Sequence, residues 1–356
     1  MTGPRNKKNK SIGRNADGGR PTIYDVSRLS GFSTATVSRV FSNYPRISQS
    51  TRSRVMAVSR KLGFSPSHIG RALARGNTRI IAVMFPVIAS GFFAEALAGI
   101  DEVLAEDNFT MLTAFYGRGR DIQSVLTRLT SGYQSDALIL ASTYDLGNNI
   151  QFPSVRQTPM VLLDRPIPGA DSGTILIDNI AGVSAMVRHL AENGHRRIAV
   201  ISGPENTWDA QQRIQGYFNA MKELNLPVDP SLIWRGDFAL ESGRQAMRKA
   251  IATRASFDAV FCLNDEMALG AIAAIHEAGL RIPDDIAIAG FDGISAAESL
   301  QLTTVICPMR DLGRAAATVA ISLTKGETNP PDQLIPVQLI VRRSSGRKMV
   351  QMAEVP

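Results

Sequence analysis

The stretch TIYDVSRLSGFSTATVSRVFS, residues 22–42, holds two short helical patterns separated by a glycine. Thr22 precedes the first pattern as a helix N-cap, and Asp25 completes a capping-box-like pair with it. Gly31 ends this pattern, where a left-handed backbone costs a glycine little. The first helix is therefore expected to bury one face, made of Ile23, Val26 and Leu29.

Two further helices are expected directly after this glycine. Ser33 is the predicted N-cap of the second, which spans about residues 34–41. Its expected buried face is Val37, Val40 and Phe41, and its expected exposed face is Thr34, Ala35, Ser38 and Arg39. The third helix begins after Ser48 or Ser50 and ends at Gly63, with a buried line of Val55, Val58 and Leu62. Three short helices around one small core predict a helix-turn-helix unit, against the alternative of a generic helical hairpin.

The basic residues are concentrated at the N-terminal end of the chain. Residues 1–80 contain 16 Lys and Arg but only Asp17 and Asp25 as acids, a formal charge of +14. The whole chain of 356 residues carries +7, so the rest is at −7. A basic end on a mildly acidic body favours a polyanionic partner. Residues 1–20, which are polar and Gly-rich, are interpreted as a disordered basic tail.

The exposed face of the second helix suits the major groove of double-stranded DNA. Its side chains are small and polar up to Arg39, whose guanidinium has the geometry to bind guanine O6 and N7 together. Nearby hydroxyls and cations are placed to hold phosphates, and these are Tyr24, Thr36, Ser38, Thr51 and Arg52.

After residue 78, apolar strand-like runs alternate with amphipathic helical runs. The predicted strands are 80–86, 110–115, 137–140, 160–164, 197–202, 259–263 and 286–291. The predicted helices lie near 93–106, 121–131, 181–193, 210–224, 241–254, 265–278 and 311–324. This alternation predicts an α/β core with parallel sheets covered by helices on both faces. Ligands of such sheets bind beyond the carboxyl ends of the strands.

Polar and aromatic residues gather at those strand ends, and their chemistry suits a polyol. Charged and amide groups pair with hydroxyls, while aromatic faces stack on the C–H faces of a sugar ring. The predicted effector-binding residues are Phe92, Phe93, Asp164, Arg165, Arg213, Phe238, Asn264 and Asp292, with Trp208 as a weaker candidate. Structural alternatives stay open: a backbone cap for Asp164, a surface ion pair for Arg165, the core for Phe93, a helix-start turn for Asn264, and the GFDGI turn for Asp292.

Other function classes find little support in the sequence. No Walker loop, HExxH or GxSxG motif occurs, and GRGRDI has Ile122 where a dinucleotide fingerprint needs its third glycine. The four histidines lack metal-ligand spacing, and two cysteines make no disulfide framework. We therefore expect no catalytic residue, no cofactor and no metal. The longest apolar runs are strand-length and the N-terminus lacks a signal-peptide core, which favours a cytoplasmic protein without membrane contact.

The segment TIYDVSRLSGFSTATVSRVFSN, followed by RISQSTRSRVMAVSRKLGFSPSHIGRALARG, resembles the LacI/GalR family of bacterial transcriptional regulators. The similarity continues to VQLIVRRSSG near the C-terminus. The resemblance implies that Thr34, Ala35 and Arg39 read bases. It also implies that SPSHIGRALARG is a hinge helix, with Leu73 inserted into the minor groove, and the alternative is a plain linker. The predicted DNA-binding residues are Tyr24, Ser33, Thr34, Ala35, Thr36, Ser38, Arg39, Thr51, Arg52 and Leu73.

For the body, the resemblance implies a two-lobed periplasmic-binding-protein-like fold. It implies that Asp164, Arg165, Arg213, Asn264 and Asp292 contact a pentose or hexose, and that Phe92, Phe93 and Phe238 stack on it. Cys307 in TTVICP departs from the glutamine of many relatives and removes a hydrogen-bonding amide. The expected segments are a tail 1–20, the headpiece 21–65, a hinge 66–78, lobe 1 (79–178 and 308–330), lobe 2 (179–307 and 331–345) and a tail 346–356.

Together these features predict a homodimeric repressor of a carbohydrate operon, which reads a pseudo-palindromic operator under control of a sugar-like effector. A dimer is expected rather than a tetramer because the sequence stops soon after RRSSG. One alternative is a sugar-binding receptor of a transport system without DNA binding, which the basic headpiece disfavours. A nucleotide-dependent enzyme is disfavoured by the failed dinucleotide fingerprint.

Overall fold

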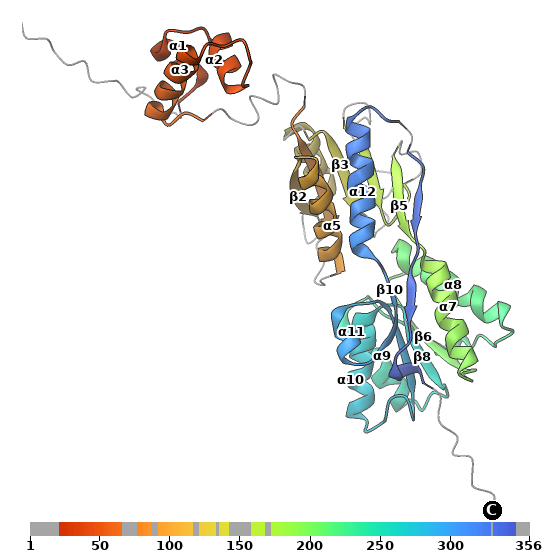
Figure 1. Ribbon diagram of the computed structural model, residues 1–356. Coiled ribbons are helices and arrows are strands. Elements are labelled where there is room, and N and C mark those ends of the chain that lie inside the picture. The colour runs from red at the N-terminus through yellow and green to blue at the C-terminus, as the bar shows by residue number, and fades with distance from the viewer. Residues whose placement is uncertain are drawn as a thin grey trace, which may run out of the picture. The chain divides into compact units, whose positions relative to one another are not determined.

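The computed structural model describes residues 21–65, 77–86, 92–116, 121–132, 135–141, 158–167, 172–328 and 330–346 (Figure 1). The two predicted tails and the hinge helix with Leu73 lie outside these residues. Contacts within the chain divide it into two units, residues 1–78 and 79–356. Each unit has a hydrophobic core of its own.

The N-terminal unit consists of the helices α1 (Ile23–Ser30), α2 (Thr34–Phe41) and α3 (Gln49–Leu62). They enclose a core of Val26, Val37, Val40 and Val55. The predicted buried faces of α2 and α3 are confirmed, but Leu29 of α1 is 43% exposed. The buried residues of α1 are instead Asp25, Val26 and Ser30, because Val26 and Ser30 lie one turn apart on one side of the helix.

The ends of these helices follow the predicted capping residues. Ser33 and Ser48 are the N-caps of α2 and α3, and the side chain of each accepts a hydrogen bond from a backbone N–H of the first turn at 3.2 Å. Gly31 and Gly63 end α1 and α3 with left-handed φ values of 77° and 66°. The turns between the helices are therefore specified locally, by residue types that leave few alternatives.

The body is built on two six-stranded sheets. The first sheet has the order β11-β5-β4-β3-β1-β2 and its strand pairs are parallel. Its strands are β1 (Ile80–Pro86), β2 (Thr110–Tyr116), β3 (Ala137–Ala141), β4 (Met160–Leu163), β5 (Gly173–Ile177) and β11 (Gln333–Ile335). We call this sheet and the helices packed on it the first lobe.

The second sheet has the order β12-β10-β9-β8-β6-β7. The pair of β10 and β12 is antiparallel, and the other strand pairs are parallel. Its strands are β6 (Ile198–Ser202), β7 (Ile233–Arg235), β8 (Ala259–Cys262), β9 (Ala287–Asp292), β10 (Thr303–Ile306) and β12 (Gln338–Ile340). We call this sheet and its helices the second lobe.

Helices cover both faces of the sheets, which confirms the predicted α/β architecture (Figure 1). The body helices are α5 (Phe92–Glu106), α6 (Ile122–Thr127), α7 (Asn179–Glu192), α8 (Trp208–Glu223), α9 (Leu240–Ala252), α10 (Asp265–Glu277), α11 (Ser295–Ser299) and α12 (Met309–Thr324), with short turns η1 (Arg128–Gly132), η2 (Pro230–Leu232) and η3 (Arg343–Ser345). Alternate residues of β1 show the two covered faces: Ile81 and Val83 join the core with α5 and α12, whereas Ala82 and Met84 pack toward α6. A strand covered on both sides reads as a continuous apolar run.

The chain returns to the second lobe later than the sequence suggested. Residues 331–345 were expected in the second lobe, but β11 pairs with β5 in the first sheet. Only β12, three residues further on, pairs with β10 of the second sheet. The crossing therefore lies at Pro336 and Val337 and not at residues 330 and 331. Two edge strands of three residues each carry too little periodic pattern to mark that position.

Within the described residues, no helix is long and apolar enough to cross a membrane.

Candidate functional site

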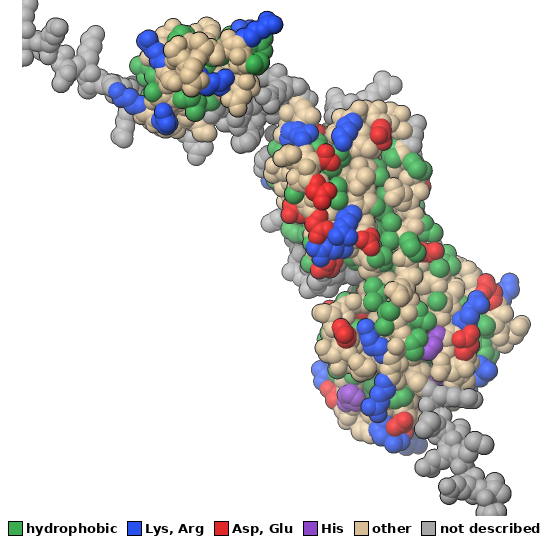
Figure 2. Space-filling view, in the orientation of Figure 1, with side chains coloured by type: hydrophobic (Ala, Val, Ile, Leu, Met, Phe, Trp, Pro, Cys, Tyr) green, Lys and Arg blue, Asp and Glu red, His purple; other side chains and the backbone are tan. Residues whose placement is uncertain are grey.

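The surface of the headpiece is basic. Exposed cations come from each of its helices and from the turn after α2, and they are Arg28, Arg39, Arg46, Arg54, Arg60 and Lys61. Asp25, the one acidic residue in the sequence from 21 to 65, is buried and accepts hydrogen bonds from Thr22 and Arg28. Figure 2 shows Lys and Arg side chains distributed over this unit. A basic surface without a competing exposed carboxylate suits a polyanion.

Helix α2 presents the residues predicted to read bases. Ala35 and Arg39 are exposed, and Thr34 and Ser38 are half-buried. The guanidinium carbon of Arg39 lies 5.8 Å from the centre of the Tyr44 ring, so the ring limits where this side chain reaches. Small side chains at the start of the helix and one positioned guanidinium at its end match the layout of a major-groove recognition helix.

Most hydroxyls among the predicted phosphate contacts already have partners within the headpiece. Ser33 and Thr36 have their hydroxyl oxygens 3.0 Å apart, and the hydroxyl of Thr51 accepts a hydrogen bond from Ser48 at 2.8 Å. Tyr24 differs, because it is 73% exposed. These positions fit local capping, and a hydroxyl that caps a helix still has a lone pair or proton for a phosphate.

Arg52 has a structural role that the sequence analysis missed. Its guanidinium donates to the backbone carbonyls of Val40 and Tyr44, each at 3.2 Å, and to the side chain of Asn43 at 2.7 Å. These bonds close the turn that follows α2. Arg52 therefore positions the recognition helix, whatever contact it makes with DNA.

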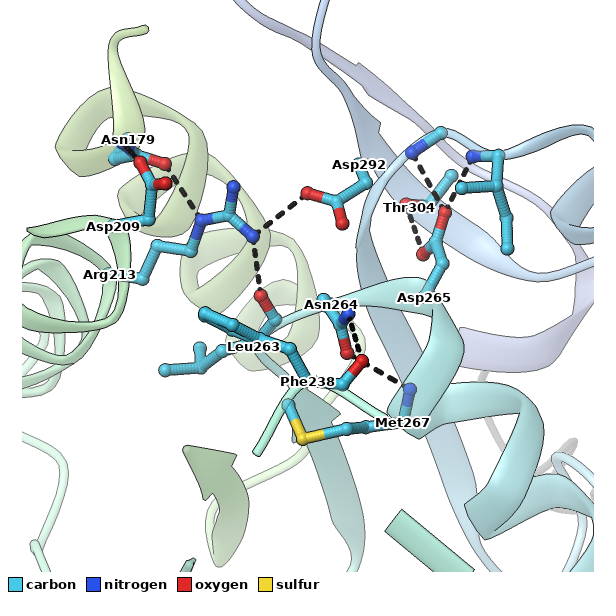
Figure 3. A network of polar contacts seen from close by, with 12 residues as sticks. Asn179, Asp209, Arg213, Phe238, Leu263, Asn264, Asp265, Met267, Asp292 and Thr304 are labelled. Atoms are coloured by element: carbon cyan, nitrogen blue, oxygen red, sulfur yellow. Dashed lines mark hydrogen bonds and ion pairs between the residues drawn. The ribbon is translucent and has the colours of Figure 1, made fainter. Parts of the chain in front are cut away.

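In the body, Arg213 is the centre of a buried polar network (Figure 3). It lies on α8 and is 2% exposed. Its Nε donates to Asn179 at 2.8 Å, and its Nη1 donates to the Leu263 carbonyl at 2.7 Å and to Asp292 at 2.9 Å. The Phe291 ring lies under the guanidinium, 4.0 Å from its carbon. Nη2 donates no hydrogen bond to the residues that the structure describes, so one edge of the guanidinium is available to a ligand.

Asp265, and not Asp292, holds the turn after β9. Its carboxylate accepts the backbone N–H groups of Gly293 and Ile294 at 2.8 and 2.9 Å and the hydroxyl of Thr304 at 2.7 Å. The side chain of Asp292 pairs with Arg213, and so the alternative role of Asp292 in holding the GFDGI turn belongs to Asp265. Burial raises the pKa of Asp292 to about 7, against the opposing effect of Arg213, and burial raises that of Asp265 to about 6.

Asn264 supports the site through Phe238. Its side-chain oxygen accepts the Met267 N–H at 3.0 Å and caps α10, and its side-chain nitrogen donates to the Phe238 carbonyl at 2.9 Å. Phe238 has a left-handed φ of 67°, and its ring lies over Gly203, where a Cβ would come within 2.2 Å of a ring carbon. The helix-start alternative for Asn264 is therefore observed, together with a hydrogen bond to the backbone of Phe238, a predicted stacking residue.

Asp164 from the first lobe lies beside the residues of the second. It follows β4 with a left-handed φ of 74°, and it is 2% exposed. Its carboxylate oxygens accept no hydrogen bond from the described residues, so it does not cap local backbone. Burial and then the neighbouring Asp209 carboxylate raise its pKa. Arg165, the next residue, is half-buried.

The phenylalanines near the first strand are placed differently from one another. Phe93 is 7% exposed, and its ring meets that of Phe85 edge to face at 5.0 Å. It is a core residue, which is the alternative to sugar stacking. Phe92 begins α5, and its side chain lies outside the described part of the structure.

Sequence reasoning missed two members of the Arg213 network. Asn179 donates to the Asp209 carboxylate at 2.8 Å and accepts from Arg213. Asp209 precedes Arg213 by one helical turn on α8, so the i, i+4 spacing was an available signal for the pair of side chains on one face. Asn179 had no such signal, because it reaches α8 only through the packing of α7 against it.

The side chains gathered around Arg213 include groups that bind polar ligands. Cys307 is buried, and its backbone N–H donates to the Asp292 carbonyl at 3.1 Å. Burial raises the pKa of its thiol, which makes it a poor nucleophile. Among the described residues, no three His, Cys, Asp or Glu side chains come together as metal ligands.

Comparison with known proteins identifies both units. Residues 22–67 match the bacterial regulatory proteins of the lacI family, and residues 187–345 match the periplasmic binding protein-like domain. The HTH-type transcriptional repressor CytR of Escherichia coli is 33% identical over 91% of this chain and 96% of its own. The regulator CelR of Thermobifida fusca is 31% identical over 92% and 98%. A lac repressor dimer bound to operator superposes with a TM-score of 0.80 at 26% identity, over 92% of this chain and all of that one.

The chain belongs to the LacI family of bacterial transcriptional regulators. It is a DNA-binding regulator that joins a helix-turn-helix unit to an effector-binding domain, as the sequence predicted. Its close relatives are transcriptional regulators and not enzymes. A transcriptional regulator CelR–cellobiose complex, with a TM-score of 0.68 and 30% identity over 91% of this chain and all of that one, is a relative solved with a sugar.

Proposed function

We propose that the protein is a homodimeric repressor, acting in the cytoplasm on a pseudo-palindromic operator, and that a polyol effector binds at the Arg213 network. The single observation that carries the effector assignment is the guanidinium of Arg213, which Asn179, Leu263 and Asp292 hold in place while its Nη2 keeps a donor edge free of described partners. A positioned cation beside a carboxylate pairs with the donor and acceptor of neighbouring hydroxyls. Phe238 supplies an apolar ring next to it.

For the DNA side, we assign base contacts to Thr34, Ala35 and Arg39. The exposure of Ala35 and Arg39 on α2 and the basic surface around them support this assignment. We assign phosphate contacts to the flanking hydroxyls of Tyr24, Ser33, Thr36, Ser38 and Thr51 and to Arg52. We keep Leu73 as the minor-groove wedge of the hinge, on the family resemblance alone.

Regulation follows from linkage between the two binding events. The effector changes operator affinity only by binding one arrangement of the protein more tightly than another. Residues of both lobes meet near Arg213, since Asp164 comes from the first sheet and Asp292 from the second. A ligand that contacts both therefore favours one arrangement of the lobes, and we propose that the hinge between body and headpiece transmits this preference.

Capture of fragmented genomic DNA by the full-length protein tests the proposal. We expect enrichment of one short palindrome, upstream of transport or catabolic genes, with each protein dimer on one palindrome. Sugars of that pathway, added to the purified operator complex, should change its Kd. Fragments without a common palindrome would contradict the operator assignment, and an operator complex indifferent to these sugars would contradict the effector assignment.

Arg39 gives the sharpest single-residue prediction for DNA. Replacing Arg39 by Ala should weaken operator binding by about 1–3 kcal/mol and relax specificity at one base pair in each half-site. Arg60→Ala, an exposed cation of α3, is the matched control for loss of charge. Binding titrations against operators altered one base pair at a time distinguish the loss of a base contact from the loss of a positive charge. A uniform loss across all sequences for Arg39→Ala would show that it contacts only phosphate.

A further inference from the structure

Two buried carboxylates from different lobes are near enough to interact with each other and with Arg213. Asp164 follows β4 of the first lobe and is 2% exposed, and Asp209 lies on α8 of the second lobe and is 6% exposed. Burial, and then the Asp209 carboxylate, raise the pKa of Asp164. Both oxygens of Asp164 are fully buried without a hydrogen-bond donor among the described residues.

The groups around this pair leave it short of positive charge. Asp209 receives one hydrogen bond from Asn179, at 2.8 Å. Arg213 faces both carboxylates, but its close ion pair is with Asp292 at 2.9 Å. Asp292 adds a further negative charge on the same side. Arg165 is the other cation nearby in sequence, and it is half-buried. The buried network therefore holds Asp164, Asp209 and Asp292 against the guanidinium of Arg213.

Burying two neighbouring carboxylates costs free energy unless a proton or a cation neutralises part of their charge. Desolvated like charges in contact repel strongly, and a proton or a bound cation removes the repulsion. Because one carboxylate comes from each lobe, the group that joins them also favours the arrangement in which the lobes bring them together. A metal ion is a poor occupant, since among the described residues no three His, Cys, Asp or Glu side chains are arranged so that they could hold one.

We propose that the effector is a polyol bearing a protonated amino group, such as an amino sugar, and that this group binds between the carboxylates of Asp164 and Asp209. The inference rests on the effector role proposed for the Arg213 network and specifies its ligand class. The ammonium donates to the oxygens of Asp164 that lack a donor, while hydroxyls of the same ligand contact Arg213 and Asp292. A positively charged ligand is favoured over sugar phosphates and sugar acids, because these add negative charge beside the buried carboxylates.

The test is calorimetric titration of the full-length protein with D-glucosamine and D-galactosamine. Each amine is compared with its neutral parent sugar and with its N-acetyl derivative, which keeps the shape and removes the charge. We expect the better amine to bind at least about tenfold more tightly than both of its matched compounds. Equal or tighter binding of a parent or N-acetyl sugar, or no binding of either amine, overturns the proposal.

The pH dependence provides a second readout. A proton on Asp164, whose pKa is raised, or on Asp292, whose pKa is about 7, competes with the ammonium, so the apparent Kd of the amine should fall as the pH rises from about 5 to about 7. The facing groups Arg213 and Asn179 do not titrate in this range, whereas Asp292, with a pKa of about 7, shifts in the same direction. A Kd that rises over this pH range contradicts the proposed ammonium site.

Substitutions assign the effect to the pair. Asp209→Asn should reduce the preference for amine over parent sugar to about onefold, whereas Glu223→Gln should keep it. Glu223 is exposed and lies on the same helix, 14 residues from Asp209, about 21 Å along the axis. Asp164→Asn is a second variant for the same loss, and it leaves no described donor unpaired. If both Asn variants keep the preference of the unmodified protein for the amine over its parent sugar, the proposal is overturned.

Failure of this inference is distinguishable from failure of the proposed function. A neutral sugar that changes the affinity of the captured operator complex would keep the repressor and contradict the amine. A protein that retains no common DNA fragment would contradict the repressor, whichever sugar it binds.

Discussion

At the scale of single residues, the buried polar network of the body is centred on the guanidinium of Arg213. Replacing Arg213 by Ala should destabilise the protein by about 3–5 kcal/mol, because Asp292 would stay buried without its partner. Arg188→Ala is the control, since its ion pair with Glu223 is exposed and 3.9 Å long, and it should cost less than about 1 kcal/mol. Urea unfolding of both variants measures the difference. An equal loss of unfolding free energy in both variants would mean that the buried contacts of Arg213 do not stabilise the fold.

The raised pKa values of the buried acids make stability depend on pH. Asp292 and Asp265 hold their protons more tightly when folded, with pKa values of about 7 and about 6. Their stabilising contribution is therefore complete below about pH 4 and is lost as the pH rises to about 7. Asp164→Asn removes another such group, so it should raise the free energy of unfolding at pH 8 more than at pH 4. A destabilised Asp164→Asn protein at pH 8 would refute this account.

At the scale of elements, the helices were predictable and the short strands were not. The predicted helices recur as α5 to α10 and α12, because each covers a sheet with one apolar face. The strands β5, β7, β10, β11 and β12 were not among those predicted. Four of these have three or four residues, and their identity depends on the neighbouring strand and not on an internal pattern.

The crossing of α5 and α12 gives a prediction at this scale. A Cβ on Gly313 would lie 2.1 Å from the Ala96 carbonyl oxygen, and one on Gly99 would lie 2.0 Å from that of Arg310. Gly313→Ala should therefore cost about 1–3 kcal/mol by forcing the helices apart, although alanine is the better helix former. Arg314→Ala, exposed on the same helix, should stay within about 1 kcal/mol. Thermal unfolding of both variants measures the difference in stability. A stabilised Gly313→Ala protein would show that the helices separate at little cost.

At the scale of the whole molecule, the charges are divided between two tasks. The first 80 residues carry +14 and the rest −7, so salt should affect the two ligands differently. Operator affinity should fall by orders of magnitude between about 50 and 200 mM salt, because phosphate contacts release counterions. Effector affinity should change far less, because its charged contacts are buried and weakly screened. Fluorescence anisotropy for DNA and calorimetry for the effector test this, and parallel slopes would contradict it.

The sequence by itself determined the headpiece, the α/β class and most of the effector candidates. Capping residues, glycines and apolar spacing act over a few residues, so Thr22, Gly31 and Ser33 could be assigned by inspection. Only the tertiary structure decided which strand-end residues meet: Asp265 takes the turn, Asn264 binds the Phe238 carbonyl, Phe93 enters the core, and Asn179 and Asp209 join Arg213. Hydrogen bonds between residues 26 to 79 positions apart depend on how helices and sheets pack, and no pattern within one segment of the sequence shows which residues will meet.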